Sequence, residues 1–319
     1  MKKPGREQTM GIVVFGAVFV DIKGYPDNKY IPGGRNVGRV IRTYGGVSRN
    51  VAEDIANVGL FPTFVSAVDD NGTGQDAVDH LRSLHINTDY ILRHPEGMGT
   101  WLAVFDNCGD VIASISKRPD LNPLLQVLED HGDRLIADAD SIVVEIDMEI
   151  ELLNRIFLLA EKHGKKIYAV VSNMAIAMER RDLLRKTACI VCNRQEAGML
   201  FTEDYTEVPP DEMCFVLHDK LSRSGIPRMV VTLGEKGAVY AESGGMCGHL
   251  PSTNVDVIDT TGAGDAFFAG VTLGLTYGKD LAESCEIGTR LACSVIVSRE
   301  SVCPRFLPEE FGLPEPPEE

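Results

Sequence analysis

Short runs of β-branched and other apolar residues alternate along the chain with longer segments whose apolar positions recur at helical spacing. The apolar runs that predict buried strands are residues 12–15, 63–66, 141–144, 166–171, 188–192 and 229–232. Apolar residues at every third or fourth position predict helices over 47–58, 75–84 and 149–163, and a glycine follows the first and the last of them. The alternation predicts an α/β fold in which helices cover both faces of a mostly parallel sheet.

Two regions interrupt this alternation. Residues 19–44 are rich in glycine, proline and charge, and residues 100–116 have the pattern of a hairpin whose turn lies at 106–110. We expect both regions to form a small β-sheet lid over one end of a single large domain that spans 11–307. The proline-rich, acidic tail over 308–319 is expected to be frayed.

Charge and hydropathy narrow the classes of partner. The 319 residues carry a formal net charge of −16, which repels nucleic acid and anionic membrane surfaces. No uncharged apolar run approaches the roughly 18 residues of a membrane span. The apolar run 11–20 follows basic residues, as in a signal peptide, but Asp21 and Lys23 come directly after it without a cleavage pattern. We therefore expect a cytoplasmic protein that binds neither nucleic acid nor membranes.

Eight cysteines are scattered along the chain, and only Cys189 and Cys192 form a CxxC pair. A zinc site of this type needs a second pair at a fitting distance, and the sequence has none. We expect reduced, buried thiols with a structural role.

The most informative stretch is 259–269, where two glycines precede an apolar, helix-prone run. A glycine turn that opens a helix directs unpaired amide N–H groups at one point, and the helix dipole adds partial positive charge there. Asp265 falls in the first helical turn, beside this anion pocket. A carboxylate in that place can take a proton from a hydroxyl while a phosphoryl group is transferred. The spacing matches neither a Walker A loop nor the GxGxxG fingerprint of dinucleotide binding.

Two segments carry a family resemblance. Residues 259–270, with the sequence Asp-Thr-Thr-Gly-Ala-Gly-Asp-Ala-Phe-Phe-Ala-Gly, resemble the C-terminal signature of the ribokinase-like (PfkB) carbohydrate and nucleoside kinases. Residues 45–52, Gly-Gly-Val-Ser-Arg-Asn-Val-Ala, resemble the N-terminal Gly-Gly signature, and the likeness extends over about 13–304. The resemblance implies a three-layer α/β/α ribokinase-like domain with a small β-sheet lid.

The resemblance also implies a set of residues that bind substrate hydroxyls: Asp21, Gly45, Gly46 and Asn50. The same residues fit an ordinary strand-to-helix turn and a capping aspartate. Asp147, past the end of a predicted strand, is expected to line the same cleft, in agreement with ligand binding beyond strand C-termini. Glu145 is a competing choice, because an alignment by eye can slip by two positions.

A further set is implied to meet the nucleotide: Asn193, Glu196, Thr232, Gly234 and Gly237. Glu196 would support Mg²⁺ through water, although Asn193 and Glu196 also fit a helix N-cap with its capping glutamate. The turn that contains Gly234 and Gly237 also fits a plain β-turn. Some family members bind K⁺ beside the anion turn, which points to Asp259 as a monovalent-cation residue.

The function implied by the resemblance is that of an ATP-dependent kinase acting on a primary hydroxyl, with ATP and Mg²⁺, and in some members K⁺, as cofactors. Asp265 would accept the hydroxyl proton, while the amides of Gly262, Ala263 and Gly264 stabilise the transferring phosphoryl group.

Segments 36–40, 100–106 and 298–304 look most like the pseudouridine kinase branch, whereas residues 116–119 depart from it. The expected acceptor is pseudouridine or a related nucleoside at its 5′-hydroxyl. A free sugar kinase for ribose or a ketohexose, and a non-catalytic sensing protein with the same fold, are the alternatives. A lid sheet with apolar residues on both faces would expose one of them, so we expect a homodimer that pairs the two lids.

Overall fold

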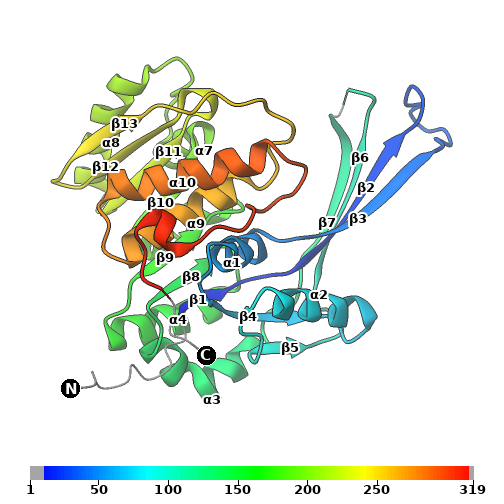
Figure 1. Ribbon diagram of the computed structural model, residues 1–319, viewed down its shortest axis with the longest axis horizontal. Helices are drawn as coiled ribbons and strands as arrows, with labels where there is room; N and C mark the ends of the chain where they lie inside the picture. Colours follow the sequence, from blue (N-terminus) through cyan, green and yellow to red (C-terminus); the bar gives the residue numbers. More distant parts are fainter. Residues whose placement is uncertain (1–10, 109, 316–319) are drawn as a thin grey trace.

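The computed structural model describes residues 11–108 and 110–315 and contains one large and one small β-sheet (Figure 1). The basic residues before position 11, Gly109 of the predicted hairpin turn and the tail end 316–319 lie outside the described residues. The large sheet has nine strands in the order β13-β12-β11-β10-β9-β8-β1-β4-β5. Its neighbours pair in parallel from β5 to β11, and only the edge pairs that involve β12 and β13 are antiparallel.

The strands of the large sheet are β1 (Ile12–Phe15), β4 (Thr63–Val68), β5 (Ile91–Arg93), β8 (Ser141–Glu145), β9 (Ile167–Val170), β10 (Cys189–Asn193), β11 (Arg228–Thr232), β12 (Ala238–Glu242) and β13 (Cys247–Leu250). The helices are α1 (Val47–Asn57), α2 (Gly72–Ser83), α3 (Leu124–Ala137), α4 (Ile150–His163), α5 (Met174–Glu179), α6 (Arg181–Leu184), α7 (Arg194–Phe201), α8 (Pro210–Ser224), α9 (Ala263–Thr276) and α10 (Leu281–Ile296). The six strands and three helices predicted from the apolar pattern are all present, with bounds that differ by a few residues.

Two hydrophobic cores lie on opposite faces of the large sheet. Successive strand residues point to opposite faces, so Val13 and Phe15 of β1 join one core while Ile12 and Val14 join the other. The first core contains α3, α4, α7 and α8, and the second contains α1, α2, α9 and α10. This arrangement confirms the three-layer α/β/α architecture. It also places the carboxyl ends of the parallel strands along one edge of the sheet, where ligands of open α/β folds bind.

The small sheet is formed by the two regions that interrupt the alternation. Its order is β3 (Gly38–Gly45), β2 (Phe19–Pro26), β6 (Gly99–Phe105) and β7 (Val111–Lys117). Strands β2 and β6 pair in parallel, and the hairpin of β6 with β7 is present as predicted. Figure 1 shows this sheet standing out from the three-layer body.

Two features of the fold differ from the sequence-based expectations. The tail was expected to be frayed from residue 308, but a 3₁₀ turn at Pro308–Phe311 packs Phe311 and Leu313 into the second core. Burial of these two apolar side chains outweighs the proline-rich, acidic composition around them. The antiparallel strands β12 and β13 were not predicted. β13 is short and only partly buried, whereas β12 has buried apolar residues at Ala238, Val239 and Ala241 that the sequence analysis overlooked.

Two further findings concern the cysteines and the helices. All eight cysteines are free, as expected, but Cys108 is exposed and Cys247 and Cys293 are only partly buried, contrary to the expectation of buried thiols. Cys189 and Cys192 are buried, and burial raises the pKa of the Cys189 thiol to about 12. This thiol therefore stays protonated, as expected for a structural role. Within residues 11–108 and 110–315, every helix is too short or too polar to cross a membrane.

Candidate active site

A cavity of about 680 Å³ lies between the small sheet and the carboxyl ends of the central strands. Its wall combines polar and aromatic side chains from both sheets and from the loops that follow them. The lining residues include Phe19, Asp21, Lys23, Tyr44, Gly45, Gly46, Asn50, Trp101, Arg118, Glu145, Asp147, Thr261 and Ser301. The structure thus brings the five residues expected to bind substrate, Asp21, Gly45, Gly46, Asn50 and Asp147, to one place.

The predicted anion turn opens α9. Gly262 is the N-cap residue of this helix and has a φ of 83°, a left-handed conformation that favours glycine. A Cβ atom at Gly262 would lie 1.9 Å from the carbonyl oxygen of Ser301, whereas one at Gly264 would meet no atom within 4 Å. The Ala263 amide already donates to the Thr260 carbonyl at 3.2 Å, which weakens its predicted role as a phosphate donor.

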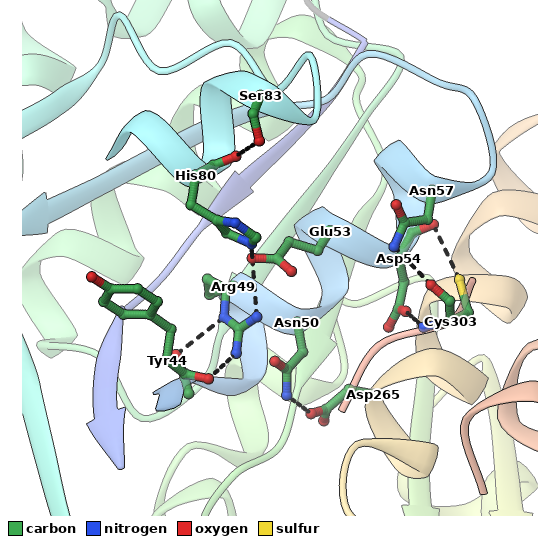
Figure 2. Close-up of polar contacts among 11 residues, drawn as sticks. Tyr44, Arg49, Asn50, Glu53, Asp54, Asn57, His80, Ser83, Asp265 and Cys303 are labelled. Atoms are coloured by element: carbon green, nitrogen blue, oxygen red, sulfur yellow. Dashed lines mark hydrogen bonds and ion pairs between the residues drawn. The ribbon is translucent and has the colours of Figure 1, made fainter. Parts of the chain in front are cut away.

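Asp265 is the third residue of α9 and connects the two family-like segments. Its Oδ2 atom accepts a hydrogen bond of 2.6 Å from Nδ2 of Asn50 on α1 (Figure 2). Burial raises the pKa of Asp265 to about 6, and the Asn50 hydrogen bond and the positive charge of Arg49 partly offset this rise. At neutral pH the carboxylate is ionised but close to its titration range, which suits a general base. Asp265 is not among the residues that line the cavity, but its hydrogen-bond partner Asn50 is. Thr261 and Ser301, which lie next to the anion turn, also line the cavity.

The Gly45-Gly46 turn lies against the aspartate of β2. A Cβ atom at Gly45 would lie 2.6 Å from Oδ1 of Asp21, and one at Gly46 would lie 2.5 Å from the carbonyl oxygen of Ala17. A side chain at Gly46 would clash with the main chain, and one at Gly45 would displace the Asp21 carboxylate. Burial raises the pKa of Asp21, against the lowering effect of Lys23 and Arg49.

The end of β8 contributes two carboxylates, so the choice between Glu145 and Asp147 has no single answer: both line the cavity. Glu145 is only 6% exposed and accepts hydrogen bonds from the Ala17 amide at 3.2 Å and the Ser48 hydroxyl at 2.9 Å. Burial and the neighbouring charge of Asp147 raise the pKa of Glu145 to about 7. Asp147 accepts a hydrogen bond of 2.8 Å from the Ser172 hydroxyl and lies 3.7 Å from the Arg118 guanidinium.

The residues expected to meet the nucleotide lie farther along the same sheet edge, outside this cavity. Asn193 at the end of β10 pairs in register with Thr232 at the end of β11. Asn193 and Glu196 form a capping box for α7, with hydrogen bonds of 2.9 and 2.8 Å, so one carboxylate oxygen of Glu196 is already engaged. This is the capping alternative left open by the sequence. The other Glu196 carboxylate oxygen takes no part in this capping box.

Gly234 and Gly237 belong to the turn after β11. A 3₁₀ turn spans Gly234–Lys236, and Gly237 has a φ of 86°, where a Cβ atom would lie 2.0 Å from the Leu250 carbonyl oxygen. Asp259 accepts a hydrogen bond of 2.8 Å from the Thr261 amide, so its side chain shapes the loop before the anion turn. In the described part of the chain, no three His, Cys, Asp or Glu residues gather closely enough to hold a metal ion together.

Several residues at the cavity were not predicted. Trp101 lies opposite Asp21 in the β2–β6 pairing, and the Lys23 ammonium lies 6.0 Å from the centre of the Trp101 ring. Strand alternation from Asp21 identifies these side chains once the pairing is known. Arg49 was overlooked although its spacing of four residues from Glu53 on a predicted helix is typical of an ion pair.

The chain is similar to known proteins over most of its length. The family model described as pfkB family carbohydrate kinase matches residues 10–305. The guanosine-inosine kinase of Exiguobacterium acetylicum is 34% identical over 292 residues, which cover 91% of this chain and 95% of that protein. The pseudouridine kinase of Escherichia coli K12 is 27% identical over 281 residues, which cover 86% of each chain. Among solved structures, the ribokinase of Arabidopsis thaliana complexed with ribose and ATP superimposes with a TM-score of 0.82 at 18% identity, covering 94% of this chain and 97% of that one.

Proposed function

Because the chain belongs to the pfkB family of carbohydrate kinases, which phosphorylate alcohol groups, we propose that it transfers the γ-phosphoryl group of ATP to the 5′-hydroxyl of a nucleoside. The hydrogen bond between Asn50 and Asp265 at the end of the cavity is the observation that supports phosphoryl transfer most directly. It joins the acceptor site to the anion turn.

Aromatic side chains in the cavity favour a nucleoside over a free sugar. Phe19, Tyr44 and Trp101 line the wall, and the flat π-system of a base can stack on such rings, whereas a free sugar has no π-system. The cavity volume falls within the range of about 300–1,000 Å³ typical of small-molecule sites. We rank a purine nucleoside first because of the 34% identity to a guanosine-inosine kinase, and pseudouridine, the acceptor expected from the sequence, second.

In the proposed mechanism the acceptor hydroxyl lies beside Asn50 at the anion turn, where Asp265 takes its proton. The amides at Gly262 and Gly264 stabilise the charge on the phosphoryl group. Mg²⁺ would neutralise charge on the phosphate oxygens, with Glu196 supporting it through water. Asn193, Thr232, Gly234 and Gly237 would orient the nucleotide. The small sheet would act as a lid that excludes water.

The proposal is tested by measuring ADP release with inosine, guanosine, pseudouridine, uridine, ribose and fructose. We expect kcat/KM for at least one nucleoside to exceed that for ribose by about tenfold or more, since a stacked base is worth about 1–3 kcal/mol. Turnover with ribose or fructose alone would assign the protein to the sugar kinases. ATP binding without turnover of any acceptor would favour the non-catalytic sensing protein.

Trp101→Ala is expected to raise the KM for the accepted nucleoside about 10- to 100-fold, because the base loses a stacking partner. The KM for ATP should remain within about twofold, since the residues assigned to the nucleotide are not among those that line the cavity with Trp101. Steady-state kinetics with each substrate varied in turn would measure both. Phe215→Ala is the matched control, because Phe215 on α8 is 71% exposed and outside the cavity. Equal effects of the two substitutions would contradict stacking on Trp101.

The proposal extends to location and assembly: a cytoplasmic homodimer that pairs its small sheets. Val40, Leu102 and Ile115, on the side of this sheet opposite the Asp21 side, are 72, 42 and 70% exposed. Pairing two such faces would bury them. Sedimentation at twice the 34.8 kDa chain mass supports the dimer, and sedimentation at the chain mass contradicts it.

A further inference from the structure

A buried ion pair lies on α1 where this helix packs against α2. Arg49 is 5% exposed and Glu53, one helical turn later, is 2% exposed, with 3.0 Å between Nη1 and Oε1. His80 of α2 lies 3.1 Å from the same Oε1 atom through Nε2 (Figure 2). Charged side chains are rarely buried to this extent, because desolvation costs several kcal/mol per ion. The burial of Arg49 and Glu53 therefore calls for an explanation beyond the packing of α1 on α2.

The rest of the Arg49 guanidinium binds the main chain at the end of β3. Nη2 donates to the carbonyl of Tyr44, and Nε donates to the carbonyl of Gly45 at 3.3 Å. These two residues end the strand that leads from the small sheet into the Gly45-Gly46 turn and α1. Arg49 thereby fixes the main chain at the junction between the small sheet and the helix that carries Asn50.

Arg49 also acts at a distance on the two acidic residues assigned to the acceptor. Its positive charge lowers the pKa of Asp21 on β2 and the pKa of Asp265 on α9. In a chain with a net charge of −16, a buried cation whose charge reaches these carboxylates favours their ionised forms.

We propose that Arg49 is a positioning residue of the acceptor site, which holds the Tyr44 and Gly45 carbonyls in place and supplies positive charge to Asp21 and Asp265. The inference rests on the proposed assignment of the cavity to the acceptor. The guanidinium suits both tasks because its planar fork satisfies several acceptors at once, whereas a lysine ammonium provides only a point charge.

The test separates geometry from charge with two variants. Arg49→Lys keeps the positive charge but loses the planar guanidinium that binds the two carbonyls. Arg49→Met combined with Glu53→Gln removes both the charge and the guanidinium. The second substitution is included because a buried Glu53 carboxylate without its partner would by itself destabilise the fold. Arg82→Met on α2 is the matched control, because the Arg82 side chain is 57% exposed and, among the described residues, contacts Asp79 and Thr88.

We expect the double variant to raise the acceptor KM at least about tenfold while the ATP KM stays within about twofold. The acidic limb of the kcat/KM profile should move to higher pH, because the ionised Asp265 loses a stabilising cation. The groups facing Asp265 are Asn50, Arg49 and Asp54 from α1 and Glu145 from β8, and only Arg49 is changed among them. In Arg49→Lys the acidic limb of the kcat/KM profile should stay at its wild-type pH, whereas the acceptor KM should still be raised.

A folded double variant with unchanged acceptor KM and unchanged pH profile would overturn the inference. If the double variant does not fold, an unchanged acceptor KM in Arg49→Lys overturns it. Hydrogen–deuterium exchange over 40–46 gives a readout that needs no acceptor, and we expect about tenfold faster exchange in both variants than in Arg82→Met. Absence of wild-type turnover with every alcohol would reject the proposed function, whereas normal exchange at 40–46 would reject the role of Arg49.

Discussion

Asp265→Asn is expected to lower kcat by at least about 100-fold, because the amide cannot take a proton from the acceptor hydroxyl. The substitution keeps the size of the side chain and an oxygen that can accept from Asn50, which donates at 2.6 Å. ATP binding should persist, since the amides of the anion turn remain. Single-turnover measurement of phosphoryl transfer at saturating ATP gives the rate of the chemical step, and near-normal turnover would remove Asp265 from this role.

The pH dependence offers a second readout of the same residue. Because burial raises the pKa of Asp265 to about 6, the base is protonated below that pH. Wild-type kcat/KM should rise through pH 6 and level off above about 7. A carboxyl group with a raised folded-state pKa favours folding at low pH, and that contribution is lost as pH rises through the folded pKa. The neutral asparagine should therefore leave the melting temperature at pH 7 unchanged or higher, so that lost activity is not lost folding.

Gly262→Ala is expected to impair both folding and catalysis. The residue has a φ of 83°, and the added methyl would lie 1.9 Å from the Ser301 carbonyl oxygen. Left-handed backbone at a non-glycine residue costs about 1–3 kcal/mol, and relieving the clash must move either the turn or the 301 loop. A displaced anion turn loses amide contacts, each worth about 100- to 1,000-fold in kcat by analogy with oxyanion holes.

Gly264→Ala is the matched stability control, because its Cβ would meet no atom within 4 Å and the residue is helical. Alanine is the better helix former by about 0.5–1 kcal/mol, so thermal unfolding should show equal or higher stability. A Gly262 variant as stable as the Gly264 variant would show that the turn tolerates the methyl group and would contradict the steric explanation.

The sequence by itself determined the architecture and the anion turn. Apolar periodicity identified the strands and helices of the three-layer body, and the glycines before Asp265 identified the start of α9. Such features are local: strand alternation, helical spacing and left-handed glycine conformations depend on residues close in the chain. For the same reason the sequence showed the small sheet as two segments that interrupt the alternation of strands and helices.

Only the tertiary structure decided which distant groups meet. The bond between Asn50 and Asp265 spans 215 positions, and both Glu145 and Asp147 reach the cavity although the sequence offered them as alternatives. The hydrogen bonds from Arg49 to the end of β3 likewise depend on how the chain passes from the small sheet into α1. The tail around Phe311 is packed, although its proline-rich, acidic composition predicted fraying, because Phe311 joins the second hydrophobic core. Burial, and with it the raised pKa of Asp265, is a property of the assembled fold, since it depends on every element packed around the carboxyl group.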